Sequence, residues 1–356
     1  ALQLENFEPD VEGGYKRIKG YQRHVRHVVP QTASSDEPVL LTTTFANKVI
    51  AARGQKIFSS ATTSLGTSSS NAIAANDSMT GSGVIIVVST TGFSSSGSLQ
   101  IDDEQFTYTG VTSTTFTGVT RATNSTTAAI HTASSDTTRT VVSESWTERD
   151  TGRSNADKYS LERFNFDGNS KIVLVDGANA PVVFNTSIAA TDISESAVAG
   201  ASIVTSFREH MFYAGMSSTP QEVVFSVAFD EDNFSSGAGA GSIRVDDTIV
   251  GLKVFRDSLF IFCENRIFKL TGSSSANFAI TPVTRDIGCI NGKTIQEFAG
   301  DLIFLGPDGL RTVAGTARIG DVELGTISSN IQSLFDENIS NATAFDSVVI
   351  PEKTQY

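Results

Sequence analysis

The sequence predicts an all-β fold: a β-propeller with blades of about four strands, an inserted small all-β domain and one short helix. Three observations lead to this expectation. Short apolar runs alternate with Gly, Pro, Asn and Asp turns, similar hairpins recur along the chain, and a Ser/Thr-rich segment interrupts them near the N-terminus. Runs of this length bounded by turn residues are typical of paired antiparallel strands.

Two hairpins between residues 249 and 313 show the pattern most clearly. Residues 258–263 (SLFIFC) are followed by a Glu-Asn-Arg turn and a second apolar run, 267–270. Residues 302–305 (LIFL) are followed by a Gly-Pro-Asp-Gly turn and the run Leu-Arg-Thr-Val at 310–313. Near-copies at a regular spacing indicate a repeat protein.

Five copies of this hairpin are found along the chain. Their first apolar residues are Val49, Ile172, Met211, Leu259 and Leu302. The last three intervals lie near the period of about 40 to 50 residues that is typical of a propeller blade. The first interval is far longer, but without residues 61–140 it also falls near this period. We therefore interpret 61–140 as an insertion into one blade.

Residues 61–140 are rich in Ser, Thr, Gly and Ala, yet they contain strand patterns. We predict strands at 84–88 and 116–121, and a hairpin of 99–101 with 106–108 around Asp102, Asp103 and Glu104. Surface loops tolerate inserted domains of this kind. The predicted organisation is therefore a propeller platform, residues 1–60 and 141–356, that encloses a small β domain, residues 61–140, and resumes at Trp146.

The C-terminal region contains the one helix that the pattern supports. Ile327, Ile331, Leu334, Phe335 and Ile339 recur at spacings of three and four, which predicts a helix over 328–340. A strand is expected to begin at 347–350. Because this last blade is incomplete, we expect the protein to continue beyond residue 356.

Composition limits the classes of function. The net charge is −13 and the isoelectric point is about 4.8, which argues against tight duplex binding because such binding depends on Lys and Arg. No apolar run approaches the roughly 20 residues of a membrane span, and the N-terminus does not resemble a secretory signal. Cys263 and Cys289 are predicted to be buried free thiols, which fits assembly in a reducing cytoplasm.

A basic cluster near the N-terminus is the candidate interface. Lys16, Arg17, Lys19 and Arg23 stand together in an otherwise acidic chain. They would contact a partner's acidic surface or a nucleic-acid backbone. Alternatively, they would keep a solvated edge strand from pairing with another sheet.

The acidic residues, the histidines and the glycine-rich loop 234–242 are the candidates for catalytic or metal-binding patterns. Adjacent acids such as Asp246-Asp247 or Asp230-Glu231-Asp232 point apart in turns and lack the spacing of a calcium loop or a glycosidase pair. The four histidines, His24, His27, His131 and His210, are scattered, and the glycine-rich loop lacks a following Lys and helix. We therefore predict no enzyme activity, no cofactor and no metal.

Several stretches together resemble a known family. The N-terminal ENFEPDVEGGYKRIKGYQR, FRDSLFIFCENRIFKL, DIGCINGKTI and GDLIFLGPDGLRTV are similar to tail tubular protein B, the nozzle protein of T7-like short-tailed phages. The resemblance covers residues 1–60 and 141–356, and the insertion is similar to a small β module of phage tail proteins. It implies a homohexameric tube in the virion tail that contacts a tail adaptor protein and tail fibres, and lets DNA pass without tight binding.

Two other classes remain open. The chain would instead be a glycan- or receptor-binding module, with Phe93, Phe106, Tyr108 and Phe116 of the insertion stacking on sugar rings. These aromatics would otherwise form the small domain's own core. A propeller glycosidase would need acidic residues that converge on the central channel.

Overall fold

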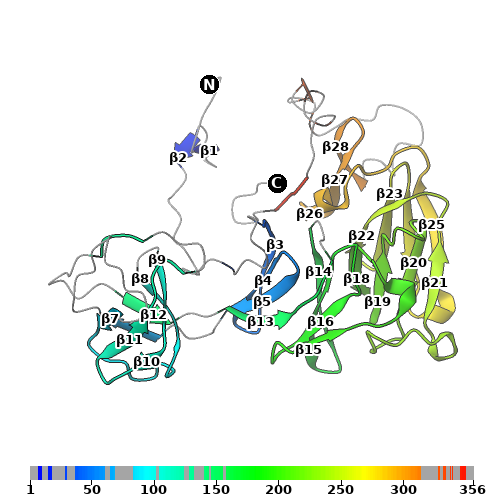
Figure 1. The fold of residues 1–356 in the computed structure, drawn as a ribbon. Helices are drawn as coiled ribbons and strands as arrows, with labels where there is room; N and C mark the ends of the chain where they lie inside the picture. The colour runs from blue at the N-terminus through cyan, green and yellow to red at the C-terminus, as the bar shows by residue number, and fades with distance from the viewer. Residues whose placement is uncertain are drawn as a thin grey trace. The chain divides into compact units, whose positions relative to one another are not determined.

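The computed structural model of the chain describes most of residues 37–313 and short segments on either side. The described residues are 7–9, 15–17, 29, 37–60, 65–68, 83–101, 104–123, 128–131, 140–143, 146–154, 158–313, 328, 332–333, 337, 339 and 345–349. They form strands, turns and three-residue 3₁₀ helices, arranged largely as four-stranded antiparallel sheets. The prediction of an all-β, propeller-type fold is confirmed (Figure 1).

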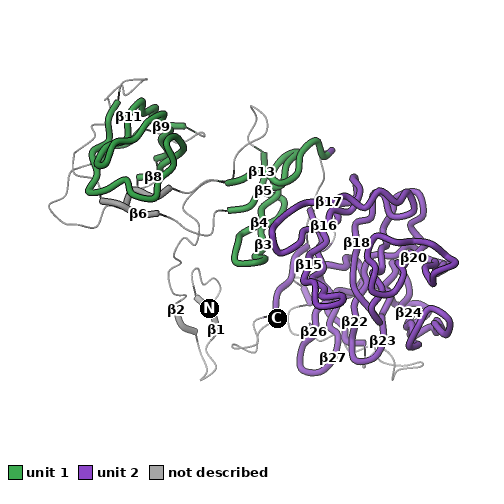
Figure 2. The backbone as a smooth tube through the Cα atoms, turned by 90° about the horizontal axis from the view of Figure 1, so that it is seen from below, with its two compact units in different colours: residues 1–153 green, residues 154–356 purple. Residues whose placement is uncertain are grey.

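The chain divides into two compact units, residues 1–153 and 154–356 (Figure 2). The second unit contains four sheets in chain order, which we call blades 2 to 5. Blade 2 comprises β14 (Ser160–Phe166), β15 (Asn169–Val175), β16 (Val182–Asn185) and β17 (Ala190–Asp192). Blade 3 comprises β18 (Ile203–Phe207), β19 (His210–Ala214), β20 (Glu222–Phe225) and β21 (Gly241–Arg244).

Blades 4 and 5 continue the same order. Blade 4 comprises β22 (Ile249–Phe255), β23 (Ser258–Cys263), β24 (Ile267–Thr271) and β25 (Ala279–Thr284). Blade 5 has three strands in the described part of the chain, β26 (Gln296–Phe298), β27 (Asp301–Gly306) and β28 (Gly309–Thr312). Each strand pairs with the next along the chain, so every blade is a meander.

Apolar side chains hold neighbouring blades together. One buried cluster joins Phe164 and Val173 of blade 2 to Met211 and Tyr213 of blade 3. Similar clusters lie between blades 3 and 4 and between blades 4 and 5. The first strands of blades 2, 3 and 4 also lie next to one another. Blades that stack face to face with adjacent first strands have the arrangement of a propeller.

A tight turn recurs between the first two strands of every blade. These turns share positive backbone φ angles at residues Ala46, Asn47, Asp167, Gly168, Arg208, Glu209, Arg256, Ala299 and Gly300. Two-residue hairpins of this kind favour Asn and Gly, because other residues are strained at positive φ. In blade 3, two consecutive residues of neither type, Arg208 and Glu209, have positive φ, so this turn carries local strain.

Replacing Glu209, which has a φ of 62°, with glycine should therefore stabilise the second unit by about 1 kcal/mol. The denaturant midpoint of the variant, compared with that of the unchanged chain, measures the gain. Glu297→Gly provides the control, because glycine weakens a strand interior and β26 should lose stability. An unchanged or lowered midpoint for Glu209→Gly would contradict the strained turn.

The first unit contains blade 1, which is formed by segments far apart in the sequence. Its strands are β3 (Val39–Phe45), β4 (Lys48–Arg53), β5 (Lys56–Ser60) and β13 (Trp146–Asp150), in that order across the sheet. Ser60 pairs directly with Trp146, so the two ends of the intervening segment are neighbours in one ladder. Because its two ends are adjacent, the inserted segment only lengthens the loop between β5 and β13 and leaves the sheet of blade 1 intact.

The intervening segment forms a β module of its own. Its strands are β6 (Leu65–Ser68), β7 (Gly83–Ile86), β8 (Gly97–Ile101), β9 (Glu104–Tyr108), β10 (Gly110–Val111), β11 (Thr115–Val119) and β12 (Thr140–Ser143). They form the sheets β10-β11-β7 and β6-β12-β8-β9. Ile85, Leu99, Ile101 and Val119 are fully buried in its core. The strands predicted at 84–88, 99–101, 106–108 and 116–121 match β7, β8, β9 and β11, with small differences at their ends.

The structure describes only part of the predicted C-terminal helix and of the strand expected after it. Most of the predicted helix 328–340 lies outside the described residues, although Gln332, Ser333 and Glu337 have helical conformation. The strand expected at 347–350 is wrong for its described residues, because 345–349 are irregular. The Ser347 hydroxyl donates a hydrogen bond to the Lys293 carbonyl at 2.7 Å, and the Ser347 carbonyl accepts one from the Gln296 side chain at 3.0 Å. Among the described residues, no helix is long and apolar enough to span a membrane.

Candidate functional site

The most highly connected polar site lies in the inserted module, at Glu104. The sequence predicts this residue in the turn of a hairpin together with Asp102 and Asp103, which lie outside the described residues. That expectation is wrong for Glu104, which is the first residue of β9 and has an exposed fraction of 0%. An ionised carboxylate without water is stable only when charged and hydrogen-bonding groups surround it.

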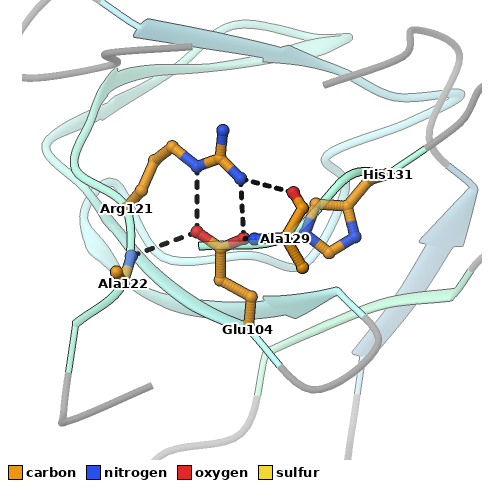
Figure 3. A network of polar contacts seen from close by, with 5 residues as sticks. All are labelled: Glu104, Arg121, Ala122, Ala129 and His131. Atoms are coloured by element: carbon orange, nitrogen blue, oxygen red, sulfur yellow. Dashed lines mark hydrogen bonds and ion pairs between the residues drawn. The ribbon is translucent and has the colours of Figure 1, made fainter. Parts of the chain in front are cut away.

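Both oxygens of Glu104 are fully engaged (Figure 3). Arg121 Nε donates to Oε1 at 2.9 Å and Arg121 Nη2 donates to Oε2 at 2.7 Å, a bidentate ion pair. The backbone amides of Ala122 and Ala129 donate to Oε1 and Oε2 at 3.1 and 2.8 Å. His131 Nε2 lies 2.9 Å from Oε2. One carboxylate therefore ties β9 to the two segments that follow β11.

Electrostatics identify this network as structural. Burial alone would raise the pKa of Glu104, but the hydrogen bonds from Arg121, the Ala129 amide and His131 outweigh burial and lower the pKa to about 2. Such a carboxylate stays ionised at neutral pH and has no free lone pair for proton transfer. Sequence reasoning missed Arg121 and His131 because nothing local links them to a residue 17 or 27 positions earlier.

The aromatics proposed for sugar stacking belong mostly to the module core. Phe106, Tyr108 and Phe116 have exposed fractions of 0%, 3% and 0%. Phe116 packs edge-on against Tyr108 at 4.8 Å and against the half-buried Phe93 at 5.0 Å. Phe106 instead lies against His131 and Arg121, with the His131 ring centroid at 5.6 Å and Arg121 Cζ 5.7 Å from the ring centroid. Glycan stacking on the three buried rings is therefore wrong, because other side chains of the module cover them. The other interpretation, that they form the module's own core, accounts for their positions.

Two of the four basic residues predicted at an interface belong to the described part of the chain. Lys16 and Arg17 lie in β2 (Tyr15–Arg17), which pairs with β1 (Phe7–Pro9) in a two-stranded sheet. Lys19 and Arg23 lie outside the described residues, as do His24 and His27. Their role at an interface stays a prediction.

Charged residues at the blade turns contact the next blade. Arg208, in the first turn of blade 3, lies 3.6 Å from the Asp257 carboxylate in the corresponding turn of blade 4. Arg256 of that turn donates to the Gly300 carbonyl of blade 5 at 3.0 Å. Between blades 2 and 3, Lys171 pairs with the buried Glu231. These residues link neighbouring blades in series.

The segment 286–295, DIGCINGKTI, joins blade 4 to blade 5. The Cys289 amide donates to the Cys263 carbonyl in β23, and the Ile290 amide donates to the Leu305 carbonyl in β27, both at 2.9 Å. A Cβ added to Gly292 would lie 2.0 Å from the Val250 carbonyl oxygen. The glycine therefore allows two backbones to meet where the blades join.

Cys263 and Cys289 are both free and buried, as predicted. Burial raises the pKa of Cys263 to about 12 and that of Cys289 to about 11. Because the thiolate is the reactive form, neither thiol should react with Ellman's reagent in the folded protein at pH 8, and both should react in guanidinium. Rapid labelling of the native chain would contradict the burial of these residues.

Several of the other acidic groups make structural contacts. Asp230 accepts a hydrogen bond from Asn233, Asp246 pairs with Arg266, and Asp247 accepts from the Asn265 amide. Within the described ranges, no group of three or more His, Cys, Asp or Glu side chains could hold a metal ion.

Comparisons with known proteins give matches at the level of fold. No family model and no curated protein matches the sequence. The phage phi92 endosialidase is similar over 76% of this chain and 52% of its own, with 13% identity and a TM-score of 0.34. A structure of the nidogen/laminin complex matches with 8% identity and a TM-score of 0.33, over 71% of this chain and 90% of that one.

A third match is BBS1N in complex with ARL6DN, with 8% identity and a TM-score of 0.30 over 77% of this chain and 76% of that one. The chain spans about half the length of the endosialidase that it matches.

Proposed function

We propose that the chain is a structural subunit of a phage tail, the nozzle protein of a short-tailed phage, which assembles as a homohexamer around a channel for the genome. The observation that carries the proposal concerns DIGCINGKTI, one of the stretches that resemble tail tubular protein B. The backbone of this stretch forms hydrogen bonds with both blade 4 and blade 5. The stretch that resembles the family therefore also holds two blades together.

The proposed role defines the partners. They are further copies of the chain, a tail adaptor protein, tail fibres and translocating DNA. The net charge of −13 would let DNA slide past without tight binding, since the 39 Asp and Glu residues outnumber the 26 Lys and Arg residues that could neutralise phosphates. We assign Lys16, Arg17, Lys19 and Arg23 to the contact with a neighbouring subunit or the adaptor. The protein would reside in the virion tail after assembly in the host cytoplasm, without a cofactor or membrane anchor.

Mass photometry of the full chain tests the assembly. The proposal predicts particles with the mass of six protomers of 37.8 kDa each. Reversing the charge of the four basic residues to glutamate should shift the particles toward smaller species. A strictly monomeric protein over the accessible concentration range, with or without an adaptor protein, would contradict the nozzle role.

A further inference from the structure

A polar pocket lies on the side of blade 3 that faces blade 2. Its floor is Val224 of β20, and Phe234 forms one wall. The opposite wall is the connection from β17 to β18, at Glu195 and the 3₁₀ helix η1 (Ser196–Val198). Its volume is about 420 Å³, within the range of about 300 to 1,000 Å³ that is typical of small-molecule sites.

The polar groups around the floor are carboxylates and hydroxyls. Glu222 and Ser242 flank Val224, because Val224 and Ser242 are paired in the ladder and Glu222 precedes Val224 by two residues on the same face. Ser218 lies in the connection between β19 and β20. No described residue forms a hydrogen bond with the side chains of Glu222, Ser218 or Ser242. They are therefore available to a ligand.

Glu195 is held in place at the rim of the pocket. Its Oε1 accepts from the Ala197 amide at 3.3 Å and from the Ser196 hydroxyl at 3.4 Å, so it caps η1. These contacts are long, and the second oxygen of the carboxylate makes no described contact. Glu195 therefore adds a second carboxylate acceptor to the lining.

The apolar part of the pocket is rigid. Val224 is 7% exposed and belongs to the core cluster between blades 2 and 3. Phe234 packs on this cluster, with its ring centroid 5.9 Å from that of Tyr213. The pocket therefore combines a hydrophobic floor and an aromatic wall with carboxylate and hydroxyl groups. This combination suits a ligand that has apolar C–H faces and hydroxyl edges.

We propose that this pocket binds an uncharged saccharide, a mono- or disaccharide unit of a larger glycan. Carboxylates accept hydrogen bonds from sugar hydroxyls, and serine hydroxyls both donate and accept them. The lining has no cationic side chain, so an acidic sugar would meet two carboxylates without compensation. A metal ion is disfavoured, because among the described residues no group of three or more His, Cys, Asp or Glu side chains could hold one. This inference goes beyond the nozzle role and is independent of it.

Saturation-transfer NMR with the full chain tests the proposal. The probes are lactose, maltose and N,N′-diacetylchitobiose as neutral sugars, 3′-sialyllactose as the acidic sugar and spermidine as the cation. Ser242→Leu would fill the pocket, and Glu222→Ala would remove an acceptor. Glu297→Ala, an exposed glutamate of β26, is the matched control. Thermal melting of each variant verifies that it is folded.

We expect saturable binding of at least one neutral sugar, with the transfer confined to particular ring protons. Affinity should fall about tenfold or more in Glu222→Ala, since a hydrogen bond to a charged group is lost. It should be abolished in Ser242→Leu and unchanged in Glu297→Ala. The proposal is overturned if no neutral sugar binds, if all variants bind equally, or if 3′-sialyllactose or spermidine is preferred.

Discussion

Replacing Glu104 with glutamine is expected to destabilise the inserted module by about 3 to 5 kcal/mol, because it breaks a buried ion pair on one side only. The amide would place N–H donors against the donors of Arg121, Ala129 or Ala122, which converge on this carboxylate. A buried guanidinium would then lack its counter-charge. Hydrogen exchange read by mass spectrometry can report this loss for the module separately from the blades.

Peptides from the module should lose about a hundredfold or more of their protection, while peptides from 158–313 should not change. Glu148→Gln is the matched control, because the Lys56–Glu148 pair lies at the surface with side-chain exposures of 35% and 45%. Such pairs contribute about 0 to 1 kcal/mol, so protection should change little. Equal effects in the two variants would show that the Glu104 network does not stabilise the module.

The same network predicts how the module responds to acid. The folded-state pKa of Glu104, about 2, lies below the ordinary value of 4.5. A lowered pKa means that the stabilisation is fully present above about pH 4.5 and is lost as the pH falls toward 2. In Glu104→Gln, this part of the pH dependence should disappear.

Gly292→Ala is expected to destabilise the second unit by about 3 kcal/mol, at the upper end of the cost of overpacking. The added Cβ would lie 2.0 Å from the Val250 carbonyl oxygen and 2.9 Å from the Gly251 Cα, so backbone rather than a flexible side chain would have to move. Because this glycine lies where blades 4 and 5 join, the loss should appear as a lower denaturant midpoint and faster exchange in both blades.

Gly237→Ala is the matched control for this substitution. Gly237 lies in the 3₁₀ helix η2 (Ser236–Ala238), and a Cβ added there would have no atom within 4 Å. The free energy of unfolding of the Gly237→Ala variant should differ from that of the unchanged chain by less than about 0.5 kcal/mol, as at most surface sites. If the two alanine variants unfolded at the same midpoint, the close approach at Gly292 would not be a constraint on the fold.

Blades 2 to 5 were predictable because each is a local meander. Apolar runs of β23 and β27 pair with the next run along the chain, so spacing and turn residues carry the information. The interrupted blade was also predictable, since removing 61–140 restored the repeat. The structure explains why the repeat tolerates the segment: Ser60 and Trp146 are ladder partners.

The polar site was not predictable from local patterns. Asp102-Asp103-Glu104 has the composition of a solvated turn, and only tertiary packing buries Glu104 beneath Arg121 and His131. The aromatic residues of the insertion posed a similar problem, because a Phe in a short strand can face either a core or a ligand. Phe116 faces the core because neighbouring rings cover it. Contacts between distant segments decide such cases.

Two-dimensional class averages of the purified full chain in electron micrographs test the proposed role as an assembly subunit. Ring-shaped particles with six-fold symmetry and an open central channel are expected. Single separate propellers at every concentration, including those at which the adaptor protein is present, would contradict this role.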